Sequence, residues 1–415
     1  ENGIEVKIID AKSLHLSPQL VAQMVGQDEP QFVGITVFTT QLRGALITAK
    51  EIKKVHPSVK IIVGGPHIHS QHREMLNKDD IDFCVRGEGE LTMLELINTS
   101  FRGKELRKVK GISFKEGDSV VINPDRPFIQ DLDILPFPAR DLLPNHIYKG
   151  SIGGREPDIF TTMTATRGCP FRCHFCSVPQ FWPTQRRRSI GNVLDELEHI
   201  YDCYKIRFIR FTGEILTLNK KWITEFCRGM VERGLNQEII WSCDTRANII
   251  SEEVLANMKK ANCGVIFYGI EFGNQRILDF SGKKTTLSQV RRAIKMTKEA
   301  GIIPTGNFMI GYPTETKETI EDTIAFAKEL DLEEASFSIV TPFPGTRLYD
   351  YCKENDLLEL SNWEEYRYFH PKKGYIKLFG LSQDELMGLY QKAHLEFYYR
   401  DIKEDIIEEL AKSYH

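Results

Sequence analysis

The chain has 415 residues, of which 41% are hydrophobic and 27% are charged, and its formal net charge is -4. This is the composition of a globular protein with more than one domain, and its weak negative charge gives no global basic field that would attract nucleic acid. The basic run at residues 186–188 is too short to change this. No apolar stretch reaches the roughly 18 residues that span a bilayer, so no membrane span is expected.

Residues 1–125 predict a doubly wound, Rossmann-like α/β domain. Apolar runs at residues 6–9, 32–37 and 60–63 indicate buried parallel strands, and an amphipathic helix is expected over residues 42–55. The chain begins with Glu1 rather than Met and shows no signal peptide. We therefore expect the first strand of the domain to be missing from this sequence and to lie outside its numbering.

Residues 126–158 form a linker in which five prolines interrupt any periodicity. Over residues 159–345, strands are expected at 160–166, 206–212, 238–243, 264–270, 304–310 and 335–341. Helices alternate with them at 191–204, 220–233, 252–261, 287–300 and 317–330. Six β/α units are too few to close an eight-fold barrel, so a partial (β/α)6 barrel is predicted. Residues 346–415 predict a mostly helical region whose aromatic side chains cap a substrate or pack into the core.

The nine cysteines are unevenly distributed along the chain. Six stand alone in apolar surroundings, as reduced, buried thiols do, whereas Cys169, Cys173 and Cys176 fall within eight residues. This contrast predicts a reducing, cytoplasmic location and one metal site ligated by thiolates.

The three clustered cysteines follow directly on the first predicted barrel strand, at the end of the strand where barrels carry their chemistry. Three thiolates can bind three irons of a 4Fe–4S cubane and leave the fourth iron open. The alternative is a structural zinc site, which needs a fourth ligand. His174 is the only local candidate, and it lies between two of the cysteines on a taut loop. We therefore favour the iron–sulfur cluster.

The Cys-x3-Cys-x2-Cys loop resembles the signature of the radical S-adenosylmethionine (SAM) superfamily, in which the open iron binds SAM. Segments at the strand ends are also similar to that superfamily: residues 211–214, 242–246, 269–273, 311–316 and 341–346. The first of these is a partial match, because Thr212 replaces a glycine. For Arg246, a surface salt bridge is an equally good interpretation. The SAM-binding residues that the resemblance implies are Phe175, Gly213, Glu214, Ser242, Arg246, Glu271, Gly311 and Pro313.

The first domain resembles the cobalamin-binding domain that precedes the barrel in many radical SAM enzymes. The similar segments are residues 34–41, 63–67, 82–90 and 131–140. Glycines at the carboxyl ends of parallel strands open the crevice where doubly wound folds bind ligands. The alternative is a domain kept as scaffold without cobalamin. The cobalamin-binding residues that the resemblance implies are Phe38, Thr39, Thr40, Gln41, Gly64, Gly65, Pro66, His67, Arg86, Gly87, Glu88, Gly89 and Glu90.

Taken together, the resemblance implies a cobalamin-dependent radical SAM methyltransferase that methylates an unactivated carbon through a 5′-deoxyadenosyl radical and methylcobalamin. It implies a 4Fe–4S cluster, SAM and cobalamin as cofactors, no classical catalytic side chain, and a one-electron reductant of the flavodoxin or ferredoxin type. A similarity to a methanogen glutamine C-methyltransferase implies a protein or peptide substrate. The alternatives are a non-methylating rearrangement or cyclisation by the same cofactors, and a non-enzymatic sensor.

Overall fold

The computed structural model describes residues 3–101, 105–150, 158–213, 215–360, 362–367 and 373–399. The chain divides into two compact units. Unit 1 comprises Glu1–Gln130, Phe343–Gly345 and Leu360–His370, and unit 2 comprises Asp131–Pro342, Thr346–Glu359 and Pro371–His415. Among the described residues, no helix is both long and apolar enough to cross a membrane.

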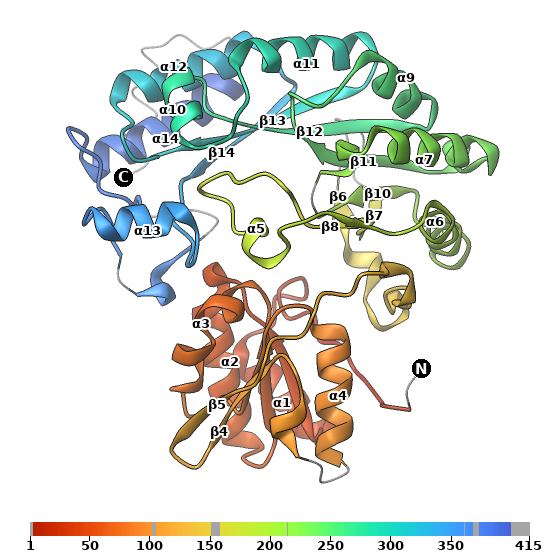
Figure 1. Ribbon diagram of the computed structural model, residues 1–415, viewed down its shortest axis with the longest axis vertical. Coiled ribbons are helices and arrows are strands. Elements are labelled where there is room, and N and C mark those ends of the chain that lie inside the picture. The colour runs from red at the N-terminus through yellow and green to blue at the C-terminus, as the bar shows by residue number, and fades with distance from the viewer. Residues whose placement is uncertain are drawn as a thin grey trace. The chain divides into compact units, whose positions relative to one another are not determined.

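Unit 1 is built on a five-stranded sheet in the order β1-β2-β3-β4-β5. The first three strands are parallel, and β4 and β5 add an antiparallel hairpin. Helices flank this sheet, and α1 packs against α2 (Figure 1). The strands are β1 (Phe32–Thr36), β2 (Lys60–Gly64), β3 (Phe83–Val85), β4 (Ile112–Glu116) and β5 (Ser119–Ile122). The helices are α1 (Pro18–Asp28), α2 (Leu42–Val55), α3 (Pro66–Leu76) and α4 (Gly89–Phe101).

The strands predicted at residues 32–37 and 60–63 are confirmed as β1 and β2, which pair from Phe32 opposite Lys60 to Thr36 opposite Gly64. The strand predicted at residues 6–9 was wrong. This segment forms no regular structure, and the Val6 and Ile8 side chains are 56% and 43% exposed. An apolar run becomes a strand only beside a hydrogen-bonding neighbour, and among the described strands β1 pairs with β2 alone.

Unit 2 is built on a curled seven-stranded sheet in the order β14-β13-β12-β11-β10-β7-β6. Six strands are parallel and β6 is antiparallel at the edge, which confirms the predicted partial barrel. The strands are β6 (Lys149–Gly150), β7 (Asp158–Met163), β10 (Phe208–Phe211), β11 (Ile240–Thr245), β12 (Cys263–Glu271), β13 (Ile303–Ile310) and β14 (Glu334–Ile339). A separate two-stranded ladder pairs β8 (Thr166–Arg167) with β9 (Arg186–Arg187).

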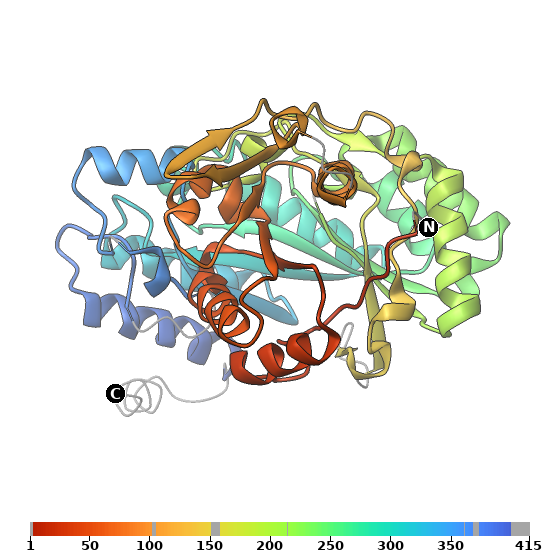
Figure 2. The same cartoon turned by 90° about the horizontal axis from the view of Figure 1, so that it is seen from below.

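Helices line the outer side of the barrel sheet, and α14 packs on α12 and β14 near its far edge (Figures 1 and 2). They start where the sequence supplies a cap. Thr286 begins α11 with a capping box to Gln289, and Ser382 begins α14 with one to Glu385. The helices are α5 (Val178–Phe181), α6 (Ile190–Tyr204), α7 (Lys220–Glu232), α8 (Leu235–Glu238), α9 (Glu252–Lys260), α10 (Gln275–Phe280), α11 (Leu287–Glu299), α12 (Lys317–Glu329), α13 (Arg347–Glu354) and α14 (Gln383–Tyr398).

A buried ion triad fastens the proline-rich segment to the barrel inside unit 2. Glu196 of α6 is fully buried, and its Oε1 lies 2.7 Å from Nη2 of Arg140. Its Oε2 accepts from Nη1 of Arg188, which precedes α6. Nearby, the Asp133 carboxylate accepts from the backbone N–H of Ser189 at 2.9 Å. One carboxylate therefore balances two guanidinium groups and holds residues 133–140 against the first barrel strand.

We expect Glu196→Gln to destabilise unit 2 by about 3–5 kcal/mol, because it leaves two guanidinium groups without their buried counter-charge. The matched control is Glu198→Gln on the same helix, whose ion pair with Arg233 is partly exposed. Its loss should cost under about 1 kcal/mol. Urea unfolding of the two variants measures the difference, and equal midpoints would show that the triad does not hold the segment.

Candidate active site

The three clustered cysteines occupy the loop that follows β8. Gly168 opens this loop with φ +98, and a Cβ there would lie 2.0 Å from the carbonyl oxygen of Thr184, so only glycine fits. The backbone N–H of Cys169 then donates to the carbonyl of Trp182 at 3.1 Å. The returning segment before β9 thus closes the loop and fixes its first cysteine.

All nine cysteines are thiols rather than disulfides. Cys173 is buried and the other two loop cysteines are half-buried. Burial, with the neighbouring Cys173 and Cys169 thiols, raises the pKa of Cys176 to about 12, so the neutral thiol is favoured until a cation is bound.

The described side chains form no closed zinc site. No three Cys, His, Asp or Glu side chains in the described ranges are close enough to hold one metal ion. A structural zinc site needs four such ligands around one ion. In a cubane each cysteine binds a different iron, so the three thiols need not approach a common point.

The loop at residues 281–285, between α10 and α11, braces the cysteine loop. The His174 N–H donates to the carbonyl of Ser281 at 2.9 Å. A Cβ on Gly282, where φ is +71, would lie 2.8 Å from Nε2 of His174. The His174 ring therefore packs on a glycine of the bracing loop.

Glu271 ends β12 in an unusual backbone conformation. Its φ is +74, and the register between β12 and β13 shifts between Gly269 and Glu271, as in a β-bulge. Bulges re-aim side chains, and a non-glycine residue at positive φ is strained. The buried Glu271 carboxylate accepts from Nζ of Lys283 at 2.7 Å. A Cβ on Gly269 would fall 2.6 Å from Oε1 of Glu271, so this glycine makes room for the ion pair.

The other predicted SAM-binding residues lie on or just after neighbouring barrel strands, and Ser242 lies within β11 rather than at its carboxyl end. Gly213 follows β10 with φ +111, whereas Glu214 lies outside the described residues. On β11 (Ile240–Thr245), Ser242 is buried, and its hydroxyl finds no hydrogen-bond partner among the residues that the structure describes. Arg246, just after β11, is only 3% exposed, so its interpretation as a surface salt bridge was wrong.

The segment after β13 contains Gly311, at φ +95, and Pro313, both buried. Phe175 packs against the hydrophobic cluster to which Tyr312 belongs. Glu315, to which the sequence assigned no role, holds this segment: one of its oxygens accepts from the N–H groups of Gly311 and Tyr312, each at 2.7 Å. Burial raises the pKa of the Glu315 carboxyl to about 7.

In unit 1, the predicted cobalamin-binding residues follow three adjacent parallel strands. Residues 38–41 follow β1, residues 64–67 end and follow β2, and residues 86–90 follow β3. Strand order therefore brings all three segments to the same edge of the sheet. Phe38 and Gln41 are exposed there, whereas Thr39 is buried.

The backbone at position 65 requires glycine. Gly65 has φ +100, and a Cβ there would lie 3.0 Å from the carbonyl oxygen of Val37. The segments after β1 and β2 thus approach each other closely, as the hydrogen bond from the His67 N–H to the Val37 carbonyl at 3.1 Å also shows. Gly64 has only ordinary contacts, the nearest at 3.8 Å.

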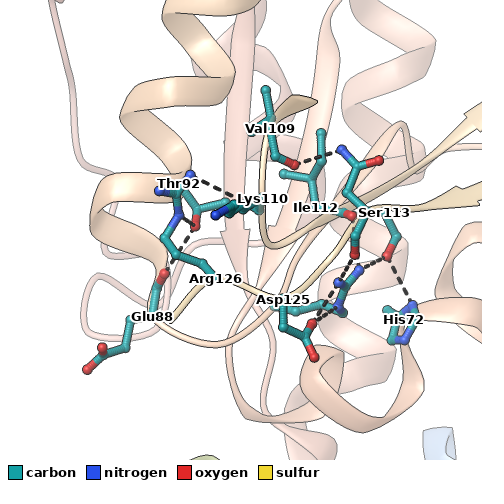
Figure 3. A network of polar contacts seen from close by, with 11 residues as sticks. His72, Glu88, Thr92, Val109, Lys110, Ile112, Ser113, Asp125 and Arg126 are labelled. Atoms are coloured by element: carbon teal, nitrogen blue, oxygen red, sulfur yellow. Dashed lines mark hydrogen bonds and ion pairs between the residues drawn. The ribbon is translucent and has the colours of Figure 1, made fainter. Parts of the chain in front are cut away.

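Arg86 and Glu88 make protein contacts that explain their burial. Arg86 donates to the Asp125 carboxylate at 2.7 and 3.0 Å and to the carbonyl of Ile112. It also donates to the hydroxyl of Ser113, and this hydroxyl in turn contacts His72 (Figure 3). The Glu88 carboxylate accepts from the backbone N–H of Ile129 at 2.7 Å. Both side chains tie β3 to the strands and loop that follow it. Gly87, at φ +71, lies between Arg86 and Glu88 and is exposed. Glu90, which follows Glu88, is exposed as well.

A segment far along the chain covers two of these loops within unit 1. The short 3-10 helix η7 (Trp363–Glu365) packs on η1 (Thr39–Gln41) and on α2. The Trp363 ring meets the buried His67 ring edge-on at 6.2 Å, and Glu364 pairs with Lys78 at 3.3 Å. Burial lowers the pKa of His67 to about 4, so its ring is neutral at physiological pH. Sequence analysis gave no signal for this contact, because it joins residues almost 300 positions apart.

The family models agree with this division of the chain. The radical SAM superfamily model matches residues 163–327, and the B12 binding domain model matches residues 1–97. An uncharacterized methyltransferase of Pyrococcus horikoshii is 38% identical over 398 residues, which cover 95% of this chain and 84% of that protein. The chain therefore belongs to the radical SAM superfamily, and to those of its members that carry a B12-binding domain.

Other relatives and solved structures are similar over most of the chain. The anaerobic magnesium-protoporphyrin IX monomethyl ester cyclase of Cereibacter sphaeroides is 31% identical, covering 94% of this chain and 63% of that protein. The structure of the radical SAM methyltransferase TsrM from Kitasatospora setae, with cobalamin and a 4Fe–4S cluster bound, aligns with a TM-score of 0.74 and 17% identity, over 97% of this chain and 84% of that one. The cobalamin-dependent enzyme OxsB aligns with a TM-score of 0.70 and 16% identity, over 96% of this chain and 64% of that one.

We expect Trp363→Ala to lower the affinity for cobalamin by about tenfold, because an edge-on aromatic contact and its buried area are worth on the order of 1.4 kcal/mol. The matched control is Phe379→Ala, which removes a side chain that is 88% exposed. Titration with hydroxocobalamin, followed by its visible absorbance, gives the dissociation constants. Equal affinities in the two variants would show that η7 does not support the loops that it covers.

Proposed function

We propose that this protein transfers a methyl group to an unactivated carbon, using a radical SAM cluster in unit 2 and cobalamin in unit 1. The observation that carries the proposal is the pairing in one chain of a three-cysteine loop at the mouth of a partial barrel with a B12-binding domain. Methyl transfer is the activity that the names of the Pyrococcus relative and of the TsrM structure state. A protein or peptide substrate stays a prediction.

Cys169, Cys173 and Cys176 would hold the cluster, and the strand ends beside them would hold SAM. When bound, the cluster supplies the electron that cleaves SAM, and cobalamin carries the methyl group. The protein's own part is to bind and orient. The Ser242 hydroxyl, which is buried and has no partner within the described part of the chain, offers a polar contact. Glu315 holds the backbone of Gly311 and Tyr312, so that this segment and the following Pro313 would present a fixed edge to a planar base.

In unit 1, the residues after β1 and β2 would form the cobalamin crevice. Phe38, Thr40 and Gln41 are not fully buried and can meet a ligand. Thr39 and His67 hydrogen-bond each other at 3.1 Å. They would support the loops that form the crevice rather than contact cobalamin directly. Gly87 and Glu90 are exposed after β3, whereas Arg86 and Glu88 have structural partners, so we assign these two a supporting role.

The decisive experiment is an assay under strong one-electron reduction, since the thiols and the chemistry both suit a reducing compartment. Enzyme loaded with iron, sulfide and cobalamin would be incubated with SAM carrying a deuterated methyl group and with proteins from its genomic neighbourhood. We expect 5′-deoxyadenosine and a product that has gained the labelled methyl. Replacing all three loop cysteines by Ala should abolish both. Production of 5′-deoxyadenosine with a changed product of unchanged carbon count would instead indicate a rearrangement or cyclisation.

We expect Glu271→Gln to weaken SAM binding by about tenfold to a hundredfold, because a charge-assisted hydrogen bond to a ribose hydroxyl is worth roughly 1–3 kcal/mol. Glutamine keeps an oxygen that can accept from Lys283, so iron and cobalamin content should stay unchanged. The control is Glu238→Gln, at the end of α8, where the carboxylate accepts from the Tyr201 hydroxyl at 2.7 Å. Calorimetric SAM titrations compare the two. Similar losses at both positions would mean that Glu271 serves the fold rather than the ligand.

A further inference from the structure

Arg246 is fixed against the cysteine loop from several sides. It follows β11 and is 3% exposed. Its Nη1 lies 3.4 Å from Sγ of Cys173, and its Nη2 donates to the carbonyl of Lys283. The face of the guanidinium lies over the Phe171 ring, with Cζ 3.9 Å from the ring centroid. A planar cation held by an aromatic face and a backbone carbonyl has little freedom to turn away from the sulfur.

The hydrogen bonds of Arg246 argue against its use as a direct SAM ligand. Each of its three nitrogens already has an acceptor within the protein: Nε donates to Asn248 at 3.3 Å, Nη1 to Cys173, and Nη2 to Lys283 and Thr285. A carboxylate of SAM would have to compete with these acceptors. Folding alone does not explain the contact between Nη1 of Arg246 and Sγ of Cys173, a cysteine that would bind the cluster.

We propose that Arg246 raises the reduction potential of the cluster by donating a hydrogen bond to Sγ of Cys173 and by placing a buried positive charge beside it. Reduction adds one electron to the cluster, and donors to its sulfur ligands and nearby cations stabilise the more negative state. Burial strengthens this effect, because little water screens the charge. Arg246 is thus a positioning and tuning residue that acts through Cys173. This inference rests on the proposed cluster at the three cysteines.

The neighbouring strand offers a matched control. Arg210 on β10 also stacks on a phenylalanine, with Cζ 3.4 Å from the Phe267 ring centroid, and it pairs with Asp244 at 2.9 Å. Its side-chain partners within the described ranges are Asp244 and Phe267, and neither is a cysteine. Arg210→Gln therefore removes a stacked guanidinium from the same sheet without removing a donor to a cluster ligand.

The test is a spectroelectrochemical titration of the reconstituted full chain, without SAM. For Arg246→Gln we expect the equilibrium constant for reduction to fall by about tenfold, which is 59 mV for one electron. Arg246→Lys keeps the charge but loses the fixed fork, so its potential should fall less. Arg210→Gln should titrate like the wild type. An unchanged potential in both Arg246 variants, with weaker SAM binding, would overturn the proposal and assign Arg246 to SAM.

Iron content separates failure of this inference from failure of the proposed function. A wild-type chain that holds no cluster would contradict the function, whereas a full cluster with an unshifted potential contradicts only the role of Arg246. A second measurement does not depend on variants that assemble well. In the reduced wild-type chain labelled with 15N-arginine, pulsed electron paramagnetic resonance should detect a weak 15N coupling to the cluster. Absence of that coupling would also overturn the proposal.

Discussion

The candidate active site depends on the buried ion pair between Glu271 and Lys283. Ion pairs are expensive to bury, and this one persists because its geometry is specific: Glu271 sits at positive φ on a bulge, and Gly269 leaves the space that the two side chains fill. The pair fixes the middle of the loop at residues 281–285. Without an oxygen acceptor at position 271 for the Lys283 ammonium group, the strained end of β12 would have no reason to keep its conformation.

That loop in turn connects the parts of the site that the sequence keeps apart. The Ser281 carbonyl receives the N–H of His174 in the cysteine loop, and the Lys283 carbonyl receives Arg246, which reaches Cys173. The segment at residues 281–285 therefore contacts the cysteine loop, the residue that follows β11 and the end of β12. Preorganisation of this kind is what a radical site requires, since the protein contributes orientation rather than acid–base chemistry.

Strong local patterns made much of the fold predictable. The barrel strands and helices were placed within a few residues because β and α periodicities alternate cleanly, and the cysteine loop was found from spacing alone. Local sequence patterns did not predict the structure where the conformation of a segment depends on a partner that is distant in the sequence. Residues 6–9 are as apolar as a strand, yet they stay exposed because no described strand pairs with them. Lys283 looks like any surface lysine in sequence, and only the bulge at Glu271 reveals its role.

The same limit applies to the division into units, and it bears on how the chain must be handled. Sequence analysis ended the first domain near residue 125, yet Trp363 and Glu364 pack on its ligand-side loops. Unit 1 is thus completed by a segment that the chain supplies only after the barrel. A fragment cut at residue 125 would expose the His67 ring and the apolar surface that Trp363 covers, at a cost of about 25 cal/mol per Å2 of apolar area. Such a fragment would lack the segment that packs on the loops after β1 and β2, so cobalamin titrations are best made on the full chain.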